Sequence, residues 1–289
     1  MTQVSVIIPT YNRAAMVRRA IDSALAQSYA AIEVIVVDDG STDQTPQIVA
    51  AVSDPRVRYL RRDENRGAQV ARNAGIAAAT GQYLAFLDSD DEWHQEKIAR
   101  QAALLDRSPD DVGLVYCGIR RIDQDGRPTH DHKPRHRGNV FEDLLLHNVI
   151  GGMSVALIRA SVFHTIGPFD ERLRARQDLD MWLRIARHYR VDYVPEKLVT
   201  YHVHRGRTSE NKSSRLQGTL ALMAKLRHDL AVRPKARAVH FFALARLYRQ
   251  RNDRGRERRY LRRSLQAQFR IRTLGRYLQN WIDSALRRG

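Results

Sequence analysis

The sequence predicts an α/β fold, a mostly parallel sheet flanked by helices, with an α-helical basic C-terminal extension. Two observations support this prediction. Over the first ~110 residues, short apolar runs alternate with segments of helical periodicity, as in βαβ units with right-handed crossovers. Beyond Arg205, the sequence becomes rich in arginine, with leucines at helical spacing.

The apolar runs of the first half predict strands at residues 4–8, 33–37, 57–60 and 83–87. The segments between them predict helices at residues 14–27, 42–51 and 68–79, the last closed by Gly81. Polar residues follow the first, second and fourth strands. Because open α/β sheets bind ligands beyond the carboxyl ends of their strands, this edge is the predicted binding site.

The second half is less regular. It predicts strands at residues 113–122, 155–158 and 191–194, a polar loop at 123–138 and a helix at 175–188. Residues 244–265 weakly resemble one helical hairpin of the TPR type, which is too short for a solenoid.

Composition limits the cellular setting. The chain has 289 residues, of which 43% are hydrophobic, enough for one large domain and an appendage. The apolar run at residues 4–8 is too short for a signal peptide, and no run approaches the ~18 residues of a membrane span. The single cysteine, Cys117, excludes an intrachain disulfide. We therefore expect a cytoplasmic protein.

Charge is concentrated in the C-terminal region. The chain carries a net charge of +17, yet residues 205–289 hold 23 basic and five acidic side chains. The 204 preceding residues are therefore almost neutral. A basic region of this kind fits nucleic acid, anionic lipid or an acidic glycan, and it also fits a solvated helical face.

Two aspartates follow the fourth predicted strand. Because side chains two residues apart in a strand point the same way, Asp88 and Asp90 can converge on one point. A divalent cation would relieve their repulsion, and oxygen ligands suit Mg²⁺ or Mn²⁺ bridging to a phosphate. The alternative is a capping turn, in which aspartate and serine are also common.

The second predicted strand ends in Asp38 and Asp39. Adjacent residues face opposite ways, so only one of them need contact a ligand. Asp39 can accept a hydrogen bond from a nucleotide base or a sugar hydroxyl. The alternative is an Asx turn followed by a helix cap at Ser41 or Thr42.

Four motifs resemble family 2 glycosyltransferases. They are VSVIIPTYNR at 4–13, VVDDGSTD at 36–43, NRG…ARNAG at 65–75 and FLDSDD at 86–91. The resemblance covers about residues 1–209. It implies a GT-A fold, with a nucleotide-sugar-binding half at 1–112 and an acceptor half at 113–209, followed by the basic helical region at 210–289.

The resemblance also implies site residues. Those at the nucleotide are Pro9, Thr10, Tyr11, Asp39, Arg72, Asp88 and Ser89. Among them, Pro9 and Tyr11 frame the base and Asp39 pairs with it. Asp90 is the implied main ligand of Mn²⁺ or Mg²⁺, assisted by Asp88. In the segment YHVH at 201–204, we favour His204 over His202 as the histidine that approaches the metal or pyrophosphate.

The segments FDERL at 169–173 and QDLDMWLR at 177–184 are similar to the family's acceptor motif. The resemblance implies that Asp178 is the catalytic base. The family usually has glutamate before this aspartate, where this chain has Gln177. Without the resemblance, Asp178 would be read as a cap or an ion-pair partner of Arg174 or Arg176. Trp182 on the same helix is expected in the core.

The implied activity is inverting transfer of a sugar from a nucleoside diphosphate donor to a hydroxyl group. We favour a UDP-sugar as the donor and a cell-envelope or extracellular glycan, or a lipid-linked acceptor. A nucleic-acid-binding protein is one alternative, but the tail's aromatic residues follow a helical apolar pattern and we expect no nucleic acid partner. A non-catalytic sugar-nucleotide binder is the other, and Asp88, Asp90 and Asp178 argue against it.

Residues 269–286 predict an amphipathic final helix. Its apolar side carries Leu274, Leu278, Trp281, Ile282 and Ala285, and its arginines are Arg270, Arg276, Arg287 and Arg288. Such a helix suits a peripheral contact with an anionic membrane, here the inner face of the cell membrane. The alternative is packing against the catalytic domain or against a second subunit of a homo-oligomer.

Overall fold

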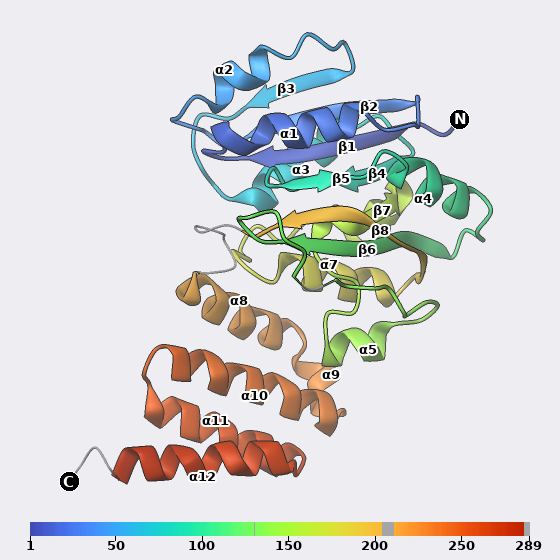
Figure 1. Ribbon diagram of the computed structural model, residues 1–289. Helices are drawn as coiled ribbons and strands as arrows, with labels where there is room; N and C mark the ends of the chain where they lie inside the picture. The colour runs from blue at the N-terminus through green and yellow to red at the C-terminus, as the bar shows by residue number, and fades with distance from the viewer. Residues whose placement is uncertain (130, 204–210, 286–289) are drawn as a thin grey trace. The chain divides into compact units, whose positions relative to one another are not determined.

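The computed structural model describes residues 1–129, 131–203 and 211–285, with the side chains of the last helix described as far as Asn280. The contacts divide the chain into two units. The sheet unit comprises Met1–Leu144, Asn148–Glu171 and Asp178–Arg205, and the helical unit comprises Leu145–His147, Arg172–Gln177 and Gly206–Gly289. One eight-stranded sheet, in the order β3-β2-β1-β4-β7-β6-β8-β5, organises the sheet unit (Figure 1).

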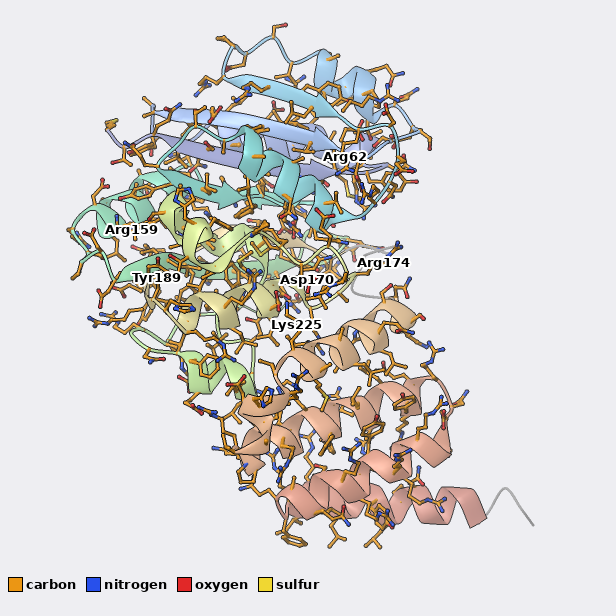
Figure 2. The ribbon with its side chains drawn as sticks, turned by 180° about the vertical axis from the view of Figure 1, so that it is seen from behind. Arg62, Arg159, Asp170, Arg174, Tyr189 and Lys225 are labelled. Atoms are coloured by element: carbon orange, nitrogen blue, oxygen red, sulfur yellow. The ribbon has the colours of Figure 1, made fainter. Side chains whose placement is uncertain are left out.

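The first half of this sheet is parallel and buried. Strands β1 (Val4–Thr10), β2 (Ile32–Asp38), β3 (Val57–Arg61) and β4 (Tyr83–Phe86) alternate with helices α1 (Ala14–Leu25), α2 (Thr45–Ala50) and α3 (Ala68–Ala78). Helix α1 lies in front of the sheet in Figure 1, and α3 lies in front of it in the reverse view of Figure 2. Because helices cover both faces, every residue of β1 and β2 is buried.

The second half of the sheet is mixed. It contains β5 (Asp91–Trp93), β6 (Val112–Ile122), β7 (Ala156–Arg159) and β8 (Arg190–His202). Its helices are α4 (Lys97–Asp106), α5 (Phe141–Leu146), α6 (Ala160–Ile166) and α7 (Gln177–Ala186), with a 3₁₀ turn at Met153–Val155. Strand β7 is antiparallel to β4 and to β6, β6 is parallel to β8, and β5 is antiparallel to β8.

The predicted α/β class and the helical C-terminal region are confirmed, while several boundaries differ. Helix α2 begins at Thr45 rather than at residue 42, because residues 39–44 form the loop that follows β2. Strand β8 runs for 13 residues where four were predicted, since Pro195 and charged neighbours hide its alternation and its pairing with β6 shifts register. The short polar strand β5 has no apolar pattern and was not predicted.

Close packing explains one motif glycine. Gly75 lies on α3, and a Cβ atom there would come within 2.4 Å of the Ile7 side chain on β1. Contact this close requires the residue without a side chain. The glycine therefore sets the distance between α3 and the sheet.

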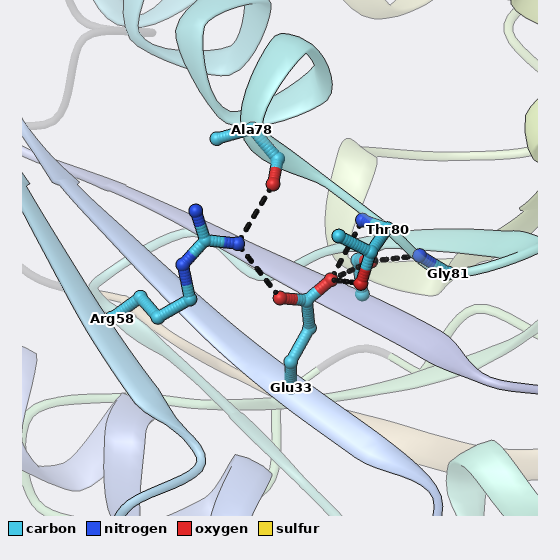
Figure 3. Close-up of polar contacts among 6 residues, drawn as sticks. Glu33, Arg58, Ala78, Thr80 and Gly81 are labelled. Carbon is cyan, nitrogen blue, oxygen red and sulfur yellow. Dashed lines mark hydrogen bonds and ion pairs between the residues drawn. The ribbon is translucent and has the colours of Figure 1, made fainter.

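A polar network joins the amino ends of the parallel strands (Figure 3). The buried carboxylate of Glu33 accepts hydrogen bonds from Ser5 Oγ at 2.6 Å, from Thr80 N and Oγ1 at 2.8 and 2.7 Å, and from Arg58 at 3.0 Å. Burial alone would raise the pKa of Glu33, but these bonds outweigh it and the pKa is lowered. Four segments are thus fastened at the end of the sheet opposite the carboxyl edge.

Arg159, labelled in Figure 2, fastens α4 to the sheet. From the end of β7 its guanidinium donates to the carbonyl oxygens of Leu105 at 2.8 Å, Ser108 at 3.1 Å and Val112 at 3.0 Å. The last carbonyls of a helix have no partner within the helix. Arg159 therefore caps α4 and the loop that leads to β6.

The helical unit stacks successive helices around a small core. Helices α8 (Lys212–Lys225), α9 (Arg227–Ala231), α10 (Pro234–Gln250), α11 (Arg254–Ala267) and α12 (Ile271–Ala285) follow one another. The core contains Leu216, Leu244, Leu247 and Tyr248, and Tyr248 stacks on Tyr260 with ring centroids 5.4 Å apart. Helices α10 and α11 form the hairpin that the pattern at 244–265 predicts.

A buried carboxylate joins the last two helices. Glu257 on α11 is 1% exposed, and its Oε2 accepts from Arg254 at 3.0 Å and from Asn280 Nδ2 at 2.8 Å. Asn280 belongs to α12 and accepts from Arg258 at 3.0 Å through its own oxygen. Within the described part of the chain, no helix combines the length and apolar character needed to cross a bilayer.

Candidate active site

The loops that follow β1, β2 and β4 share one edge of the sheet. Strand β1 pairs in parallel with β2 on one side and with β4 on the other. The carboxyl ends of the three strands are therefore neighbours, at the edge where open α/β sheets bind ligands. Residues 10–13, 38–43 and 87–91 meet there.

The first two loops are interlocked. Asn12 has a positive φ of 49°, and its side-chain oxygen accepts from Thr42 N at 2.9 Å, while its own N–H donates to Ser41 Oγ at 2.9 Å. Arg13 N also donates to Thr45 Oγ1 at 3.0 Å. The motifs TYNR and DDGSTD thus form one hydrogen-bonded unit, and sequence reasoning assigned Asn12 no role.

Three predicted nucleotide-binding residues end β1. Pro9 and Thr10 are buried, whereas Tyr11 is 39% exposed and presents its ring at the surface. Thr10 Oγ1 is buried and has no hydrogen-bond partner among the described residues. Buried hydroxyl groups are usually paired, so this atom suits contact with a ligand.

Asp38 and Asp39 have separate environments, as the sequence predicts. Asp38 accepts from Ser41 N at 2.9 Å and from Tyr59 Oη at 2.7 Å, so both of its oxygens serve the fold. The Asx-type turn therefore belongs to Asp38 rather than to Asp39. Burial, reinforced by the Asp38 carboxylate, raises the pKa of Tyr59.

Asp39 has one oxygen that accepts two hydrogen bonds and one that accepts none among the described residues. Its Oδ2 accepts from the backbone N–H groups of Arg66 at 3.0 Å and Gly67 at 2.6 Å. Its Oδ1 is buried, makes no hydrogen bond among the described residues and lies 3.5 Å from Nε of Arg62, which Figure 2 labels. Gly40, with a φ of +78°, lets the chain turn against the backbone of Glu64. The carboxylate is thus held in position, and its Oδ1 can still accept a hydrogen bond from a ligand.

The acidic motif after β4 forms a turn rather than a strand end. Strand β4 ends at Phe86, and Asp91 N donates to Asp88 O at 2.9 Å. The strand alternation expected to align Asp88 and Asp90 therefore does not apply, and the turn places them instead. Ser89 is buried, and Asp90 is partly buried.

Arg72 and its neighbour connect α3 to this turn and to the segment before α7. The Arg72 guanidinium is 5% exposed and donates to Asp88 Oδ1 at 2.6 Å. Asn73 Oδ1 accepts from Phe169 N at 2.8 Å, and its amide donates to Glu171 Oε1 at 3.1 Å. The motifs ARNAG, FLDSDD and FDERL are therefore in direct contact.

One residue that the sequence did not single out, Ser154, holds the acidic turn. Ser154 Oγ accepts from Asp88 N at 3.1 Å and donates to Asp91 Oδ2 at 2.5 Å. Burial, followed by the charges of Asp88 and Asp90, raises the pKa of Asp91 well above its usual range. No sequence signal links Ser154 to a motif more than 60 residues away.

The acidic turn fits a divalent cation that also has ligands from outside the protein. The described residues contain no cluster of three histidine, cysteine, aspartate or glutamate side chains arranged to hold a metal. Mg²⁺ characteristically binds through one or two carboxylates together with substrate phosphates. Burial is the main cause of the raised pKa of Asp91, and the negative charges of Asp88 and Asp90, which add to it, favour a cation at this turn.

Asp178 lies in the first turn of α7, where Asn148 positions it. The Asn148 amide donates to Asp178 Oδ2 at 3.0 Å and to Gly151 O at 3.0 Å. Its own oxygen accepts from Gly151 N at 3.0 Å, and Trp182 Nε1 also donates to Gly151 O. Trp182 is fully buried, as expected. The carboxylate is therefore oriented by a loop that sequence reasoning did not connect to it.

The departure from the family pattern at Gln177 has a local explanation. Its side-chain N–H donates to the carbonyl oxygen of Leu173 at 2.9 Å. A glutamate has no N–H to donate and would place a carboxylate against that oxygen. The amide therefore suits the turn that precedes α7.

Of the two candidate histidines, His202 is described and His204 lies outside the described residues. His202 Nε2 is 3.2 Å from Glu92 Oε2, across the pairing of β8 with β5. Burial, followed by the charge of Arg19, lowers the pKa of His202. This strand pairing brings the segment before His204 beside the strand that follows the acidic turn.

Comparisons with known proteins identify the family of this chain. Residues 5–167 match the model for glycosyl transferase family 2. The chain is 37% identical to the uncharacterised glycosyltransferase RP339 of Rickettsia prowazekii, over 74% of this chain and 68% of that protein. It is 34% identical to the putative teichuronic acid biosynthesis glycosyltransferase TuaG of Bacillus subtilis, over 72% of this chain and 82% of TuaG.

Solved structures share the fold. The mannosyltransferase PcManGT from Pyrobaculum calidifontis, in complex with GDP-Man and Mn²⁺, superposes with a TM-score of 0.65 at 23% identity, over 99% of this chain and 81% of that one. TarS of S. aureus superposes with a TM-score of 0.66 at 20% identity, over 94% of this chain but only 50% of TarS. With a GT-A fold and a family match over more than half its length, this chain belongs to glycosyl transferase family 2.

Proposed function

We propose that this glycosyltransferase moves a sugar, with inversion, from a nucleoside diphosphate donor to a hydroxyl group of a glycan or lipid-linked acceptor. A UDP-sugar is the favoured donor, and the product is a cell-envelope or extracellular polysaccharide. The names of similar proteins support this assignment, since TuaG is assigned to teichuronic acid and WcaA of Escherichia coli to colanic acid biosynthesis. The solved relatives include complexes with UDP-GlcNAc and with GDP-Man.

The observation that carries the proposal is the pairing of two kinds of carboxylate at one edge of the sheet. Asp39 keeps an acceptor oxygen without a hydrogen bond at the end of β2, which suits an N–H of a nucleobase. The carboxylates of Asp88 and Asp90 follow the end of β4, two strands away, and their negative charges help to raise the pKa of the buried Asp91 beside them. A diphosphate fits between them only if its charge is neutralised, as a metal-bound nucleotide allows.

We assign Asp90 and Asp88 as the residues that hold Mn²⁺ or Mg²⁺, with His204 as a third ligand. Bound there, the ion would neutralise the charge that develops on the departing diphosphate. The Arg72 guanidinium holds the Asp88 carboxylate in place, and the hydrogen bond from the Asp88 N–H to Ser154 Oγ fixes the backbone. Pro9, Thr10 and Tyr11 would frame the base, and Ser89 would lie beside the nucleotide.

Asp178 is the proposed base. In this mechanism its carboxylate removes the proton from the acceptor hydroxyl as that oxygen attacks the anomeric carbon. The bond from this carbon to the diphosphate oxygen breaks in the same step, which inverts the configuration. The hydrogen bond from Asn148 would orient one carboxylate oxygen for this role.

The test is a panel of UDP- and GDP-sugars with Mn²⁺, measuring release of the nucleoside diphosphate and binding by calorimetry. We expect Asp178→Asn to lower turnover ~10²–10⁴-fold with donor affinity unchanged, the usual size of a general-base contribution. Asp22→Asn, which changes an exposed carboxylate on α1, is the matched control and should keep full activity. Nucleotide binding without turnover by the wild-type protein would identify a non-catalytic binder and contradict the proposal.

We also propose which parts of the chain bind the donor and the acceptor. Residues 1–112 would hold the donor, residues 113–209 the acceptor, and residues 210–289 a separate helical region. The division of the contacts into a sheet unit and a helical unit supports the last part of this proposal, a separate helical region. Cys117 is buried and unpaired with another cysteine, which is consistent with the cytoplasmic location that we propose.

A further inference from the structure

Helix α12 packs within the helical unit through polar side chains. Thr273 and Asn280 are 2% and 1% exposed, and the Asn280 amide is bonded to Glu257 and Arg258 of α11. These residues are seven positions apart, so they lie on one side of the helix. The side that faces α11 therefore includes buried polar side chains.

The apolar side chains of the same segment are exposed. Phe269, Ile271 and Leu278 are 65%, 81% and 51% exposed. They are three of the six large hydrophobic side chains that are exposed in the described part of the chain, and they lie within ten residues. Ile271 and Leu278 are two turns apart and form one stripe. The sequence continues this stripe with Trp281 and Ile282, whose side chains lie outside the described residues.

Positive charge surrounds this stripe. Arg270 and Arg272 are exposed at the start of α12, and Arg276 follows one turn later. Burial, followed by the positive charges of Arg249, Arg246 and Arg272, lowers the pKa of Arg276 despite the opposing effect of Glu257. Glu257 is itself buried and bonded to Arg254 and Asn280, and among the described side chains no carboxylate forms an ion pair with Arg270 or Arg272.

An apolar stripe flanked by arginines could contact a second copy of the chain, a nucleic acid or a lipid bilayer, and these partners can be distinguished by their chemistry. A second copy would bring the same arginines together, which disfavours a dimer through this face. Nucleic acid would satisfy the arginines but would leave Ile271 and Leu278 in water. The interface of an anionic bilayer accommodates both, because acyl chains meet the apolar side and phosphate groups meet the arginines.

We propose that α12 binds in the interface of an anionic lipid bilayer, with Phe269, Ile271 and Leu278 among the acyl chains and Arg270 and Arg272 at the headgroups. The helix lies along the surface without crossing it. This inference rests on the helical unit alone and is independent of the proposed donor and acceptor. It gives the basic region a function that the sugar-transfer site does not require.

Co-sedimentation of the full chain with vesicles tests the proposal. The probes are phosphatidylcholine vesicles with and without 30 mol% phosphatidylglycerol, at low and high salt. We expect binding to the anionic vesicles alone, weakened by salt. Each of Arg270→Gln and Arg272→Gln should lower the partition coefficient about five-fold, and the double variant Ile271→Ser/Leu278→Ser should lower it at least ten-fold.

The control is the double variant Val232→Ser/Lys235→Gln, which changes one exposed apolar and one exposed basic residue of the same unit. It should bind vesicles like the wild type. Thermal unfolding should show that both double variants remain folded. Absence of wild-type binding at low salt, or equal binding by the Ile271→Ser/Leu278→Ser variant, would overturn the proposal. Self-association or RNA binding lost in that variant, without vesicle binding, would assign the face to those partners instead.

Discussion

Removing one hydroxyl group, in Ser154→Ala, should damage both stability and catalysis. Ser154 is 2% exposed and joins the Asp88 N–H to the carboxyl group of Asp91. Asp91 is 4% exposed, and its other oxygen has no hydrogen bond among the described residues. The substitution would leave the whole buried carboxyl group without a hydrogen-bond partner.

The magnitude follows from these two contacts. Leaving a buried polar group unsatisfied costs about 1–3 kcal/mol, and the partly accessible Asp88 N–H should cost about 1 kcal/mol. We therefore expect Ser154→Ala to lower the free energy of unfolding by about 2–4 kcal/mol. A domain with about 5–15 kcal/mol of stability would remain folded. Because misplacement of a site by about 1 Å can cost 10²-fold, we expect kcat to fall about 10–100-fold.

Urea unfolding and steady-state kinetics with saturating acceptor measure both effects. Ser28→Ala is the matched control, since its exposed hydroxyl donates only to Gln95 O. It should change the free energy of unfolding by less than about 0.5 kcal/mol. A double-mutant cycle with Asp91→Ala should give a coupling energy of about 1–3 kcal/mol. A Ser154→Ala variant with wild-type stability and kcat would refute the reasoning.

Three further predictions concern other parts of the sheet unit. Asp39→Asn keeps an oxygen for the backbone N–H groups but turns an N–H toward the base, so the KM for the donor should rise about 10–100-fold. The control variant Asp63→Asn should have the wild-type KM. An unaltered KM in Asp39→Asn would place the base elsewhere. Asp90→Ala should abolish transfer while preserving the unfolding transition, and full wild-type activity in excess EDTA would contradict the metal assignment. Because the pKa of Glu33 is lowered by folding, its stabilisation is present above the unfolded pKa of about 4.3 and is lost as the pH falls through the folded value. Glu33→Gln should therefore flatten the loss of unfolding free energy between about pH 5 and pH 3, whereas parallel curves would show that this network does not titrate on unfolding.

The parallel half of the fold could be predicted because its signals are local. Residues 4–8 and 33–37 are apolar except for Ser5 and Glu33, and both segments lie in fully buried strands. Strand β8 could not be delimited in this way, because Pro195 and a shift of register interrupt its pattern. Strand β5 is set by pairing with Val199–Tyr201, a long-range contact that no local pattern encodes.

In the candidate site, too, the features with a local sequence signal could be predicted and those that depend on long-range contacts could not. Sequence motifs identify both Asp39 and Asp88. The position of Asp39 follows from the end of β2, whereas the turn after β4 places Asp88. The groups that hold these two residues lie far away in sequence: the backbone N–H groups of Arg66 and Gly67 donate to the Asp39 carboxylate, and Ser154 Oγ accepts from the Asp88 backbone N–H. Such partners depend on how the chain folds back, so the sequence alone could not name them.

The hydrogen bonds between the loops that follow β1 and β2 have a consequence for natural variation. Asn12 meets two requirements through its residue type, since it adopts a left-handed backbone and its side-chain oxygen accepts from Thr42 N, while its backbone N–H, which any residue except proline would supply, donates to Ser41 Oγ. A substitution at Asn12 therefore leaves the Thr42 N–H unsatisfied, while loss of the hydroxyl at Ser41 leaves the Asn12 N–H unsatisfied. Among relatives, each of these two positions should be kept for its own reason, and new base specificities should arise at Tyr11 and around Asp39 without disturbing them.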